Sequence, residues 1–298
     1  MNDIYDLAIV GAGLSALSTL NVLSTMSTEA AGEGIVILDY QQTPGGFLSS
    51  ALPAPGFEDA WELIQSFRIP RGAVTHFGAT AVGLLPAPGP GEVHSLVVRL
   101  RQGTVHLHAQ RVLIASGGLE ATREHAHIPG TRPAGVITPV MAHQLLSRGY
   151  LPGRQVVVYG SARYARVTAR RLASAGVKVT LVASTPPGDD QHSELPVELA
   201  EIMGFPRLEC VKLRRGSQFF ALPADTLVYA AGMIANTHWL RGSGVDIGSG
   251  GAIQVDAHYQ TNVPGIFAMG TVVAPSLDHA ASITMGKEVA SLLAGGFL

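Results

Sequence analysis

A strand followed at once by a glycine-rich turn opens the chain. Residues 4–10 are largely apolar and run into Gly11-Ala12-Gly13-Leu14-Ser15-Ala16, a G-x-G-x-x-A spacing that begins a helix expected over Leu14–Met26. In this motif the first glycine permits the tight turn, the second lets the backbone approach a pyrophosphate, and the small last residue keeps the helix close to the strand. The N–H groups at the helix N-terminus favour negative charge. The opening segment therefore predicts a dinucleotide site.

The next expected strand strengthens this prediction. Residues 35–38 are apolar, and Asp39 follows them at the strand end. A carboxylate at this place can accept hydrogen bonds from the hydroxyls of a ribose. The alternative is a structural strand–helix–strand unit without a ligand, and the acid in this position counts against it.

Composition limits the class of protein. The 298 residues suggest two domains, or one domain with an insertion. A net charge of −2 gives no case for a nucleic-acid partner or an anionic membrane surface. Cys210 is the single cysteine, so neither an intrachain disulfide nor a Cys-x-x-Cys redox pair can form. We expect no secretory signal and no transmembrane segment, and therefore a cytoplasmic protein.

A second strand–helix–strand pattern lies inside the chain. The sequence predicts a strand over Gln155–Tyr159, a helix over Ala162–Ala175 and a strand over Val177–Val182. We therefore expect an α/β fold of two nested Rossmann-like domains. The predicted boundaries are 1–118 and 230–298 for the two parts of the first domain, and 119–229 for the inserted domain.

Between these two patterns the sequence predicts short strands and a loop. The strands are expected at residues 73–85, 92–100, 104–109 and 111–115, and the loop at 41–60.

The segment Thr261–Gly270, which ends in Gly-Ile-Phe-Ala-Met-Gly, is the most specific string in the chain. It resembles the last FAD-contacting motif of the flavoprotein disulfide reductase superfamily, which includes the thioredoxin reductases. The opening turn, the strand ending in Ala115-Ser116-Gly117-Gly118 and this segment occur in the order of that superfamily, so the resemblance covers essentially the whole chain. It implies an FAD-binding domain with an inserted NAD(P)-binding-like domain, and an FAD-dependent oxidoreductase.

One branch of the superfamily fits better than the others. The segments at 128–136, 150–154 and 44–48 are similar to those of FAD-dependent dehydrogenase subunits. These include subunits of hydrogen cyanide synthase and of the opine, proline and glycerol-3-phosphate dehydrogenase-associated type. The thioredoxin reductases differ by a Cys-x-x-Cys in the second domain, which this chain lacks.

The resemblance implies a set of cofactor contacts in the first domain. They are Gly11, Ala12, Gly13, Leu14, Ser15, Ala16, Asp39, Tyr40, Gly45, Gly46, Phe47, Ala81, Val82, Ala115, Ser116, Gly117, Gly270, Thr271 and His279. The backbone N–H groups near Val272 and Val273 are expected to face the flavin.

Two positions depart from the superfamily pattern. The second fingerprint begins at Gly160, but its middle glycine is replaced by Ala162, followed by Arg163. The Cβ of Ala162 would lie where a pyrophosphate needs bare backbone, and no acid ends the following strand, so we expect NAD(P) binding there to be weakened or lost. Thr271 stands where the superfamily has aspartate, and its hydroxyl can still donate a hydrogen bond.

The catalytic groups are not identified by any motif. Asp278 and His279 are candidates, because they closely follow the flavin-contacting strand, and a helix is expected to begin near them. His125 and His127 have no third ligand at a suitable spacing, so no metal site is expected. Arg163, Arg166 and Arg170 recur at helical spacing and predict one solvated helix face, with a docking patch for an acidic partner as the alternative.

Three functions remain open from the sequence. The first is an FAD-dependent dehydrogenase, or a dehydrogenase subunit, without a redox-active disulfide, which passes electrons from a small organic substrate to a partner protein or acceptor. The second is an NAD(P)H-dependent flavin oxidoreductase. The third is a non-catalytic FAD-binding scaffold or regulatory protein. A homo-oligomer and a complex with a partner subunit are both compatible with these functions.

Overall fold

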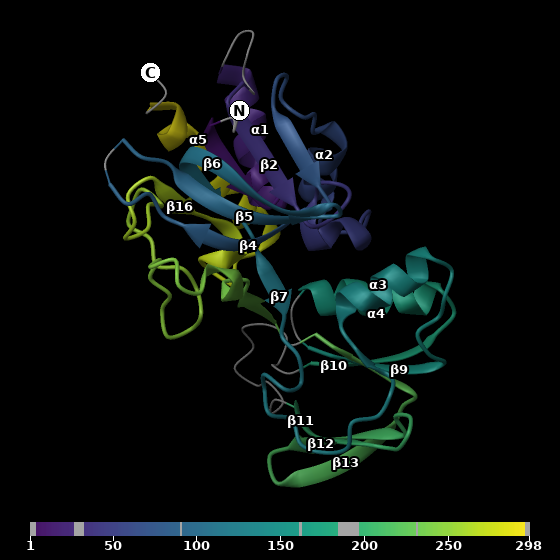
Figure 1. Cartoon of the computed structure of the whole chain (residues 1–298). Helices are drawn as coiled ribbons and strands as arrows, with labels where there is room; N and C mark the ends of the chain where they lie inside the picture. The colour runs from purple at the N-terminus through teal and green to yellow at the C-terminus, as the bar shows by residue number, and fades with distance from the viewer. Residues whose placement is uncertain are drawn as a thin grey trace. The chain divides into compact units, whose positions relative to one another are not determined.

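The chain divides into two compact units. A computed structural model describes residues 4–26, 33–89, 91–160, 163–183, 197–230 and 232–295. The first unit comprises Met1–Ser49, Gly56–Leu119 and Met233–Leu298, and the second comprises Ser50–Pro55 and Glu120–Gly232 (Figure 1). The expected boundaries lie one to three residues from these, and the short segment Ser50–Pro55 was not expected in the second unit.

A seven-stranded sheet is the centre of the first unit. Its strands β1 (Ile4–Val10), β2 (Ile35–Asp39), β3 (Val74–Phe77), β6 (Gly103–Ile114) and β16 (Ile266–Ala268) pair in parallel. The strands β4 (Thr80–Leu85) and β5 (His94–Leu100) add antiparallel pairs at the side of β6. The central strands are buried on both faces, which explains their continuous apolar runs.

The strand β6 corrects a prediction. Two strands were expected at 104–109 and 111–115, but Gly103–Ile114 forms one strand of 12 residues. Its first half pairs with β5 and its second half with β1 and β16, so the exposed Gln110 lies inside a continuous ladder. The polar Gln110 was interpreted as a break between two strands. The sequence does not show that the strand changes its pairing partners at this residue.

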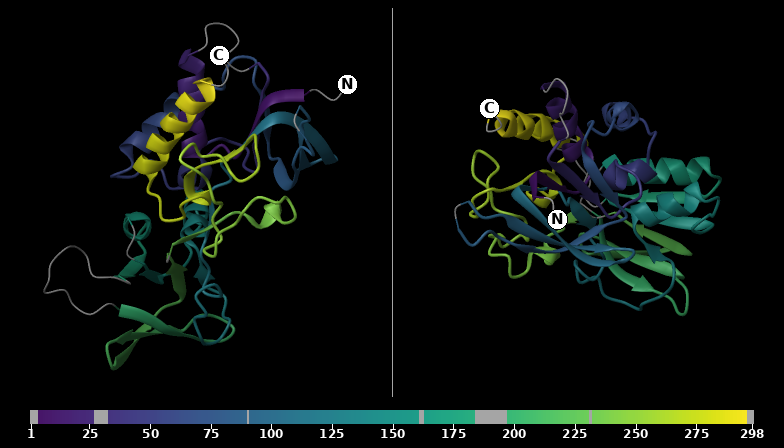
Figure 2. Two further views of the ribbon diagram at one scale, coloured as in Figure 1. Left: turned by 90° about the vertical axis from the view of Figure 1, so that its left-hand side faces the viewer. Right: turned by 45° about the horizontal axis from the view of Figure 1, so that its top comes forward.

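Two helices pack side by side against the first sheet. They are α1 (Leu14–Met26) and α5 (His279–Gly295), which begin where they were expected (Figure 2). A Cβ on Gly286 would overlap the carbonyl oxygen of Ser15, so the absence of a side chain permits the close approach of the two helices. This contact holds the middle of α5 against the first turn of α1. The first unit also contains α2 (Glu58–Ser66) and the short 3₁₀ segments η1 (Gly46–Ser50), η2 (His238–Leu240) and η3 (Gly270–Val272).

The second unit has a parallel sheet of its own. The strand order is β10 (Lys178–Val182), β9 (Gln155–Tyr159), β14 (Thr226–Tyr229) and β8 (Val136–Ile137). The helix α4 (Arg163–Ser174) confirms the expected strand–helix–strand pattern. Two further short strands pair with each other: β15 (Met233–Ala235) of the first unit, and β7 (Gly118–Glu120), of which Gly118 and Leu119 belong to the first unit.

Other elements of the second unit were missed. The helix α3 (Pro139–Ser147) has Thr138 at its N-cap, whose side chain accepts a hydrogen bond from the N–H of Met141. The pair Thr138-Pro139 was a usable start signal for this helix. The antiparallel sheet of β11 (Val197–Met203), β12 (Cys210–Arg215) and β13 (Gln218–Pro223) was also not expected.

His143 forms a buried polar contact between α3 and α4. Its Nδ1 lies 3.1 Å from Nη1 of Arg171, and its Nε2 lies 3.0 Å from Oγ1 of Thr168. Because a guanidinium can only donate, Nδ1 accepts and Nε2 carries the proton of a neutral imidazole. Burial, together with the positive charge of Arg171, lowers the pKa of His143 to about 4.

The contact at Gly286 predicts a stability effect. Gly286→Ala should lower the free energy of unfolding by about 1–2 kcal/mol, because overpacking exceeds the gain in helix propensity. Chemical denaturation measures this change. Gly250→Ala is the control, because no heavy atom of the described residues lies within 4 Å of a Cβ at that exposed position. Equal stabilities of the two variants would contradict the tight contact.

The lowered pKa of His143 predicts a pH dependence. Between pH 6.5 and about 4 the unfolded chain binds more protons at His143 than the folded chain does, so the free energy of unfolding falls as pH falls through this range. The loss from this residue should be about 3 kcal/mol. In His143→Gln this part of the pH dependence should disappear, whereas in His125→Gln, a variant of an exposed histidine, it should remain. Denaturation at several pH values measures both, and parallel curves for wild type and His143→Gln would contradict the assignment.

Candidate functional site

A cavity opens within the first unit where the parallel strands end. Its empty volume is about 1140 Å³, counting the part that is open to solvent. Most of the predicted cofactor contacts line it. They are Gly11, Gly13, Leu14, Ser15, Ala16, Asp39, Tyr40, Gly45, Gly46, Phe47, Ala81, Ala115, Ser116, Gly117, Gly270, Thr271 and His279. Ala12, Val82 and Asp278 are not among the lining residues.

The turn after β1 forms one wall of the cavity through bare backbone. Gly11 has a φ of +105°, and a Cβ there would overlap the carbonyl oxygen of Ala115. Gly13 has no heavy atom of the described residues within 4 Å of the place of a Cβ. The two glycines therefore differ in role, because Gly11 allows the turn to pack on β6 and Gly13 leaves space for a ligand.

Asp39 is buried at the end of β2 and is held by two backbone groups. The N–H of Ala12 donates to its Oδ2 at 2.6 Å, and the N–H of Gln41 donates to its Oδ1 at 2.7 Å. Burial raises the pKa of the Asp39 carboxyl, and the two N–H donors partly offset this rise. Each carboxylate oxygen keeps a further lone pair. Ala12 thus orients Asp39 through its N–H without lining the cavity.

Another part of the cavity wall joins two segments that are far apart in the sequence. Oγ of Ser116 donates to the carbonyl oxygen of Asn236 at 3.0 Å, and the N–H of Asn236 donates to the carbonyl oxygen of Gly117 at 3.0 Å. Nδ2 of Asn236 donates to the carbonyl oxygen of Ser116 at 3.3 Å. Oδ1 of Asn236 is buried without a hydrogen-bond partner among the described residues. This orphaned acceptor belongs to a residue that lines the cavity, and it suits a donor on a bound ligand.

Asn236 was missed by the sequence analysis. Like His238 and Trp239, which also line the cavity, it lies after β15 and outside every glycine-rich motif. A single asparagine in such a position carries no local signal, so only the pairing with Ser116 and Gly117 reveals its place.

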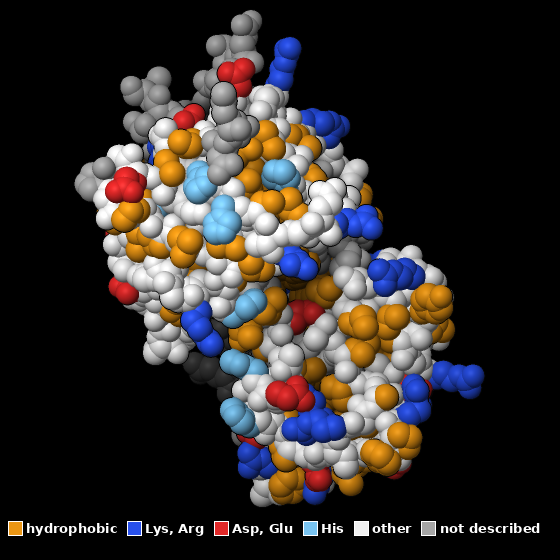
Figure 3. All heavy atoms as spheres, viewed as in Figure 1, with side chains coloured by type: hydrophobic (Ala, Val, Ile, Leu, Met, Phe, Trp, Pro, Cys, Tyr) orange, Lys and Arg blue, Asp and Glu red, His pale blue; other side chains and the backbone are white. Residues whose placement is uncertain are grey.

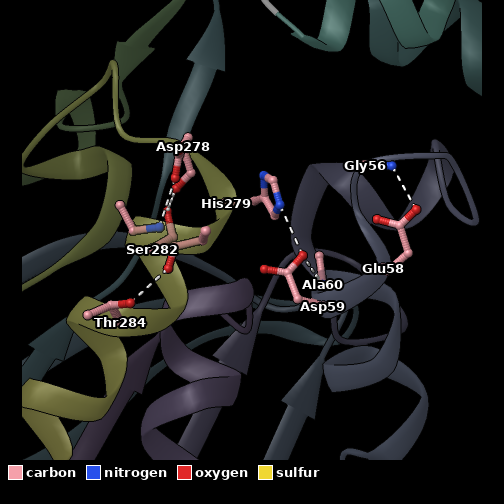
Figure 4. A network of polar contacts seen from close by, with 10 residues as sticks. Gly56, Glu58, Asp59, Ala60, Asp278, His279, Ser282 and Thr284 are labelled. Atoms are coloured by element: carbon pink, nitrogen blue, oxygen red, sulfur yellow. Dashed lines mark hydrogen bonds and ion pairs between the residues drawn. The ribbon is translucent and has the colours of Figure 1, made fainter.

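His279 lies at the cavity and is paired with a carboxylate. Its Nε2 lies 3.0 Å from Oδ1 of Asp59, and its side chain is 8% exposed (Figure 4). The N–H of Ala60 also donates to Oδ1 of Asp59 at 2.8 Å. The ring of Phe57 packs on the imidazole with a centroid distance of 4.6 Å. These contacts fix the orientation of the His279 ring.

Asp278 has a structural place instead. Its Oδ1 accepts the N–H of Ala281 at 2.8 Å, which caps the N-terminus of α5 (Figure 4). The expectation for Val273 is wrong, because its N–H donates to the carbonyl oxygen of Gly270 within η3 and does not face the cavity. The sequence does not show that η3 closes on itself in this way.

The second fingerprint keeps its tight turn. Gly160 has a φ of +152°, and a Cβ there would overlap the carbonyl oxygen of Ala230. Its N–H donates to the carbonyl oxygen of Val182 at 2.9 Å. Ala162 lies outside the described residues, as does the end of the following strand at 184–185. The structure therefore shows the turn but not the position that we expect to weaken it.

Other predicted residues lie on surfaces. Arg163, Arg166 and Arg170 are all exposed on α4, which confirms one shared helix face. His125 and His127 are exposed residues of a turn. Figure 3 shows histidine side chains at the surface over β5 and β6.

In the described part of the chain no group of three or more His, Cys, Asp or Glu side chains could hold a metal ion. No helix within the described ranges is long and apolar enough to cross a membrane.

Comparisons with known proteins point to redox enzymes. The pattern of the family described as pyridine nucleotide-disulphide oxidoreductase matches residues 192–285. A soluble pyridine nucleotide transhydrogenase from Ectopseudomonas mendocina is 28% identical over 176 residues, which cover 51% of this chain and 36% of that protein. The chain thus spans about a third of the length of this curated relative. These similarities support the predicted relationship to flavin-dependent oxidoreductases.

Solved structures confirm the fold. Thioredoxin reductase from T. acidophilum superposes with a TM-score of 0.72 at 20% identity, over 98% of each chain. L-Proline dehydrogenase from P. horikoshii superposes with a TM-score of 0.73 at 19% identity, over 99% of this chain and 56% of that one. The predicted α/β fold with two nested Rossmann-like domains is therefore confirmed.

Proposed function

We propose that the cavity of the first unit binds FAD and that the chain is an FAD-dependent oxidoreductase without a redox-active disulfide. One observation carries the proposal: a single cavity unites the turn at Gly11–Gly13, the buried Asp39 and the segment at Gly270–Thr271. These regions are far apart in the sequence, and each has the chemistry that one part of FAD requires. The similarity to flavin-dependent oxidoreductases agrees with this assignment.

The lining residues fit the parts of FAD. The bare backbone at Gly13 and the first turn of α1 suit the pyrophosphate, and the free lone pairs of Asp39 suit the ribose hydroxyls. The orphaned Oδ1 of Asn236 and the hydroxyl of Thr271 suit hydroxyl or ring N–H groups on the flavin side. When bound, FAD supplies the acceptance and release of two electrons.

His279 is the proposed acid–base group. Because its Nε2 faces the Asp59 carboxylate, Nδ1 is the acceptor atom of the neutral imidazole. A proton from a substrate can therefore be taken at Nδ1, and Asp59 stabilises the imidazolium that forms. Asp59 acts as a positioning residue, and Phe57 limits rotation of the ring.

We infer the substrate class from the single cysteine of the chain and from its similarity to a dehydrogenase. Cys210 is the single cysteine and lies on β12 of the second unit, so dithiol chemistry of the Cys-x-x-Cys type is excluded. The similarity to a proline dehydrogenase agrees with the resemblance to dehydrogenase subunits. We infer a small organic substrate, with a partner protein or a diffusible acceptor receiving the electrons in the cytoplasm.

An NAD(P)H-dependent flavin oxidoreductase is the second candidate. The retained tight turn at Gly160 favours it, because this turn is the first requirement of a second dinucleotide site. A non-catalytic FAD-binding scaffold remains the third and would show FAD binding without reduction by any donor.

FAD binding predicts a difference between the two glycines of the first turn. Gly13→Ala should fold normally but bind FAD about tenfold or more weakly, because its Cβ occupies the space for the pyrophosphate. Gly11→Ala should lose stability as well, since its φ and its contact with Ala115 exclude a side chain. Flavin fluorescence titration and thermal unfolding separate the two effects.

The control for this experiment is Gly250→Ala, which should match wild type in both measurements. A wild-type protein that purifies colourless and cannot be reconstituted with FAD would overturn the proposal.

The role of His279 predicts a loss of rate without a loss of FAD. A panel of small amino and hydroxy acids is screened anaerobically for bleaching of the bound flavin, and the best donor is used with the variants. His279→Gln should slow bleaching by about 10²-fold or more, and Asp59→Asn by a smaller factor, with unchanged FAD affinity. His258→Gln, at an exposed position, is the control.

The outcomes of this experiment distinguish the candidates. Bleaching of His279→Gln at the wild-type rate would remove its proposed role. Rapid bleaching by NADH or NADPH, and by none of the acids, would favour the second candidate. No bleaching by any donor would favour the scaffold.

A further inference from the structure

A second cavity lies within the second unit, and none of the predicted cofactor contacts lines it. Its empty volume is about 550 Å³, counting the part that is open to solvent. Its polar lining residues are Thr122, Arg123, Glu124, Arg132, Thr138 and Tyr229. All of them belong to the second unit, so the cavity does not depend on residues of the first.

Arg123 is the unusual member of this lining. Its side chain is 5% exposed, yet Nε, Nη1 and Nη2 are all buried without a hydrogen-bond partner among the described residues. Its Nε lies 3.2 Å from Oε1 of Glu124, which is its one ion pair within the described part of the chain. A buried guanidinium has five N–H groups and is always charged, so the outer end of this side chain lacks acceptors. Such a group is costly unless something accepts from it.

Glu124 cannot fill this gap. Its Oε1 also lies 3.5 Å from Nε of Arg132, so one carboxylate is shared by two guanidinium groups. Glu124 and Arg132 have side chains that are 56% and 62% exposed, so this pairing is weakened by solvent. Arg123, Glu124 and Arg132 together carry a net charge of +1. The N–H donors without partners belong to the buried Arg123.

The backbone around Arg123 is well held. The N–H of Ile128 donates to the carbonyl oxygen of Arg123 at 3.0 Å, and the N–H of His127 donates to that of Glu124 at 3.1 Å. The N–H of His125 donates to the carbonyl oxygen of Thr122 at 3.1 Å. These turn contacts keep Arg123 in place before any ligand arrives.

We propose that this cavity binds an oxyanion, the carboxylate or phosphate group of a small molecule, through Nη1 and Nη2 of Arg123. The planar guanidinium can donate to two oxygens of one such group in parallel, which matches its two free ends. The hydroxyl-bearing residues Thr122 and Tyr229 line the same cavity and provide further polar surface. This site is separate from the proposed FAD site and does not rest on it.

The test uses the full chain, and each titration is run with and without excess FAD, so that its result does not depend on the proposed FAD site. Sodium phosphate and sodium acetate are titrated by calorimetry at constant ionic strength, with sodium chloride as the balancing salt. Wild type should bind at least one of the two anions, and the dissociation constant should rise about tenfold or more in Arg123→Met. Arg148→Met is the matched control, because it removes an exposed arginine from the same unit and should leave binding unchanged.

Thermal unfolding gives an independent readout. Without anion, Arg123→Met should unfold at the wild-type temperature or above it, because an unpaired buried charge is replaced by an apolar side chain. Addition of the anion should raise the unfolding temperature of wild type and of Arg148→Met, but not of Arg123→Met.

The outcomes are separable. Binding of phosphate alone would indicate a ligand with a phosphate group, and binding of acetate alone would indicate a ligand with a carboxylate. Either result supports the site. Unchanged binding in Arg123→Met, an equal loss in Arg148→Met, or no binding of either anion by wild type would overturn the proposal. If Arg123→Met does not fold, Arg123→Lys keeps the charge and loses the planar fork, and wild-type affinity in that variant would also overturn it.

Discussion

The close packing of the β1–α1 turn on the neighbouring strand is the contact on which the first unit depends. The N–H of Gly11 donates to the carbonyl oxygen of Leu38 on β2, and the N–H of Ala115 donates to that of Val10 on β1. The missing side chain of Gly11 lets these three strand ends approach one another. Because the strands are parallel, their carboxyl ends meet at one edge, and the helix N-terminus and Asp39 arrive there together.

The buried polar groups differ in whether the described residues supply them with hydrogen-bond partners. His143 is neutral and has a partner at each ring nitrogen, so it stabilises the packing of α3 on α4. Oδ1 of Asn236 and the Nη atoms of Arg123 have no partner in the described part of the chain. Folded proteins rarely leave such atoms unsatisfied, and both of these line a cavity, which is why each points to a ligand.

Much of the fold could be predicted because its signals are local. The strand–turn–helix at the N-terminus, the helix from His279 and the strand–helix–strand pattern of the second unit all follow from apolar runs and turn glycines. The errors arose where an element depends on its partner. The strand β6 continues through Gln110 because it changes neighbours there. In the sheet of β11, β12 and β13, the last strand is exposed along nearly its whole length, so burial imposes no alternation of apolar residues on it. The N–H of Val273 is used within its own 3₁₀ turn, which no sequence pattern shows.

The sequence by itself determined the class of fold and the residues of the dinucleotide turn, because glycines at fixed spacing act on the backbone within a few residues. It also shows a single cysteine, so the given sequence holds no Cys-x-x-Cys pair. Only the tertiary structure decided that His279 is paired with Asp59 while the adjacent Asp278 caps a helix. It likewise decided that Asn236 lines the first cavity and that the donors of Arg123 are left over at the second. These roles depend on partners far along the chain, and long-range contacts leave no local pattern.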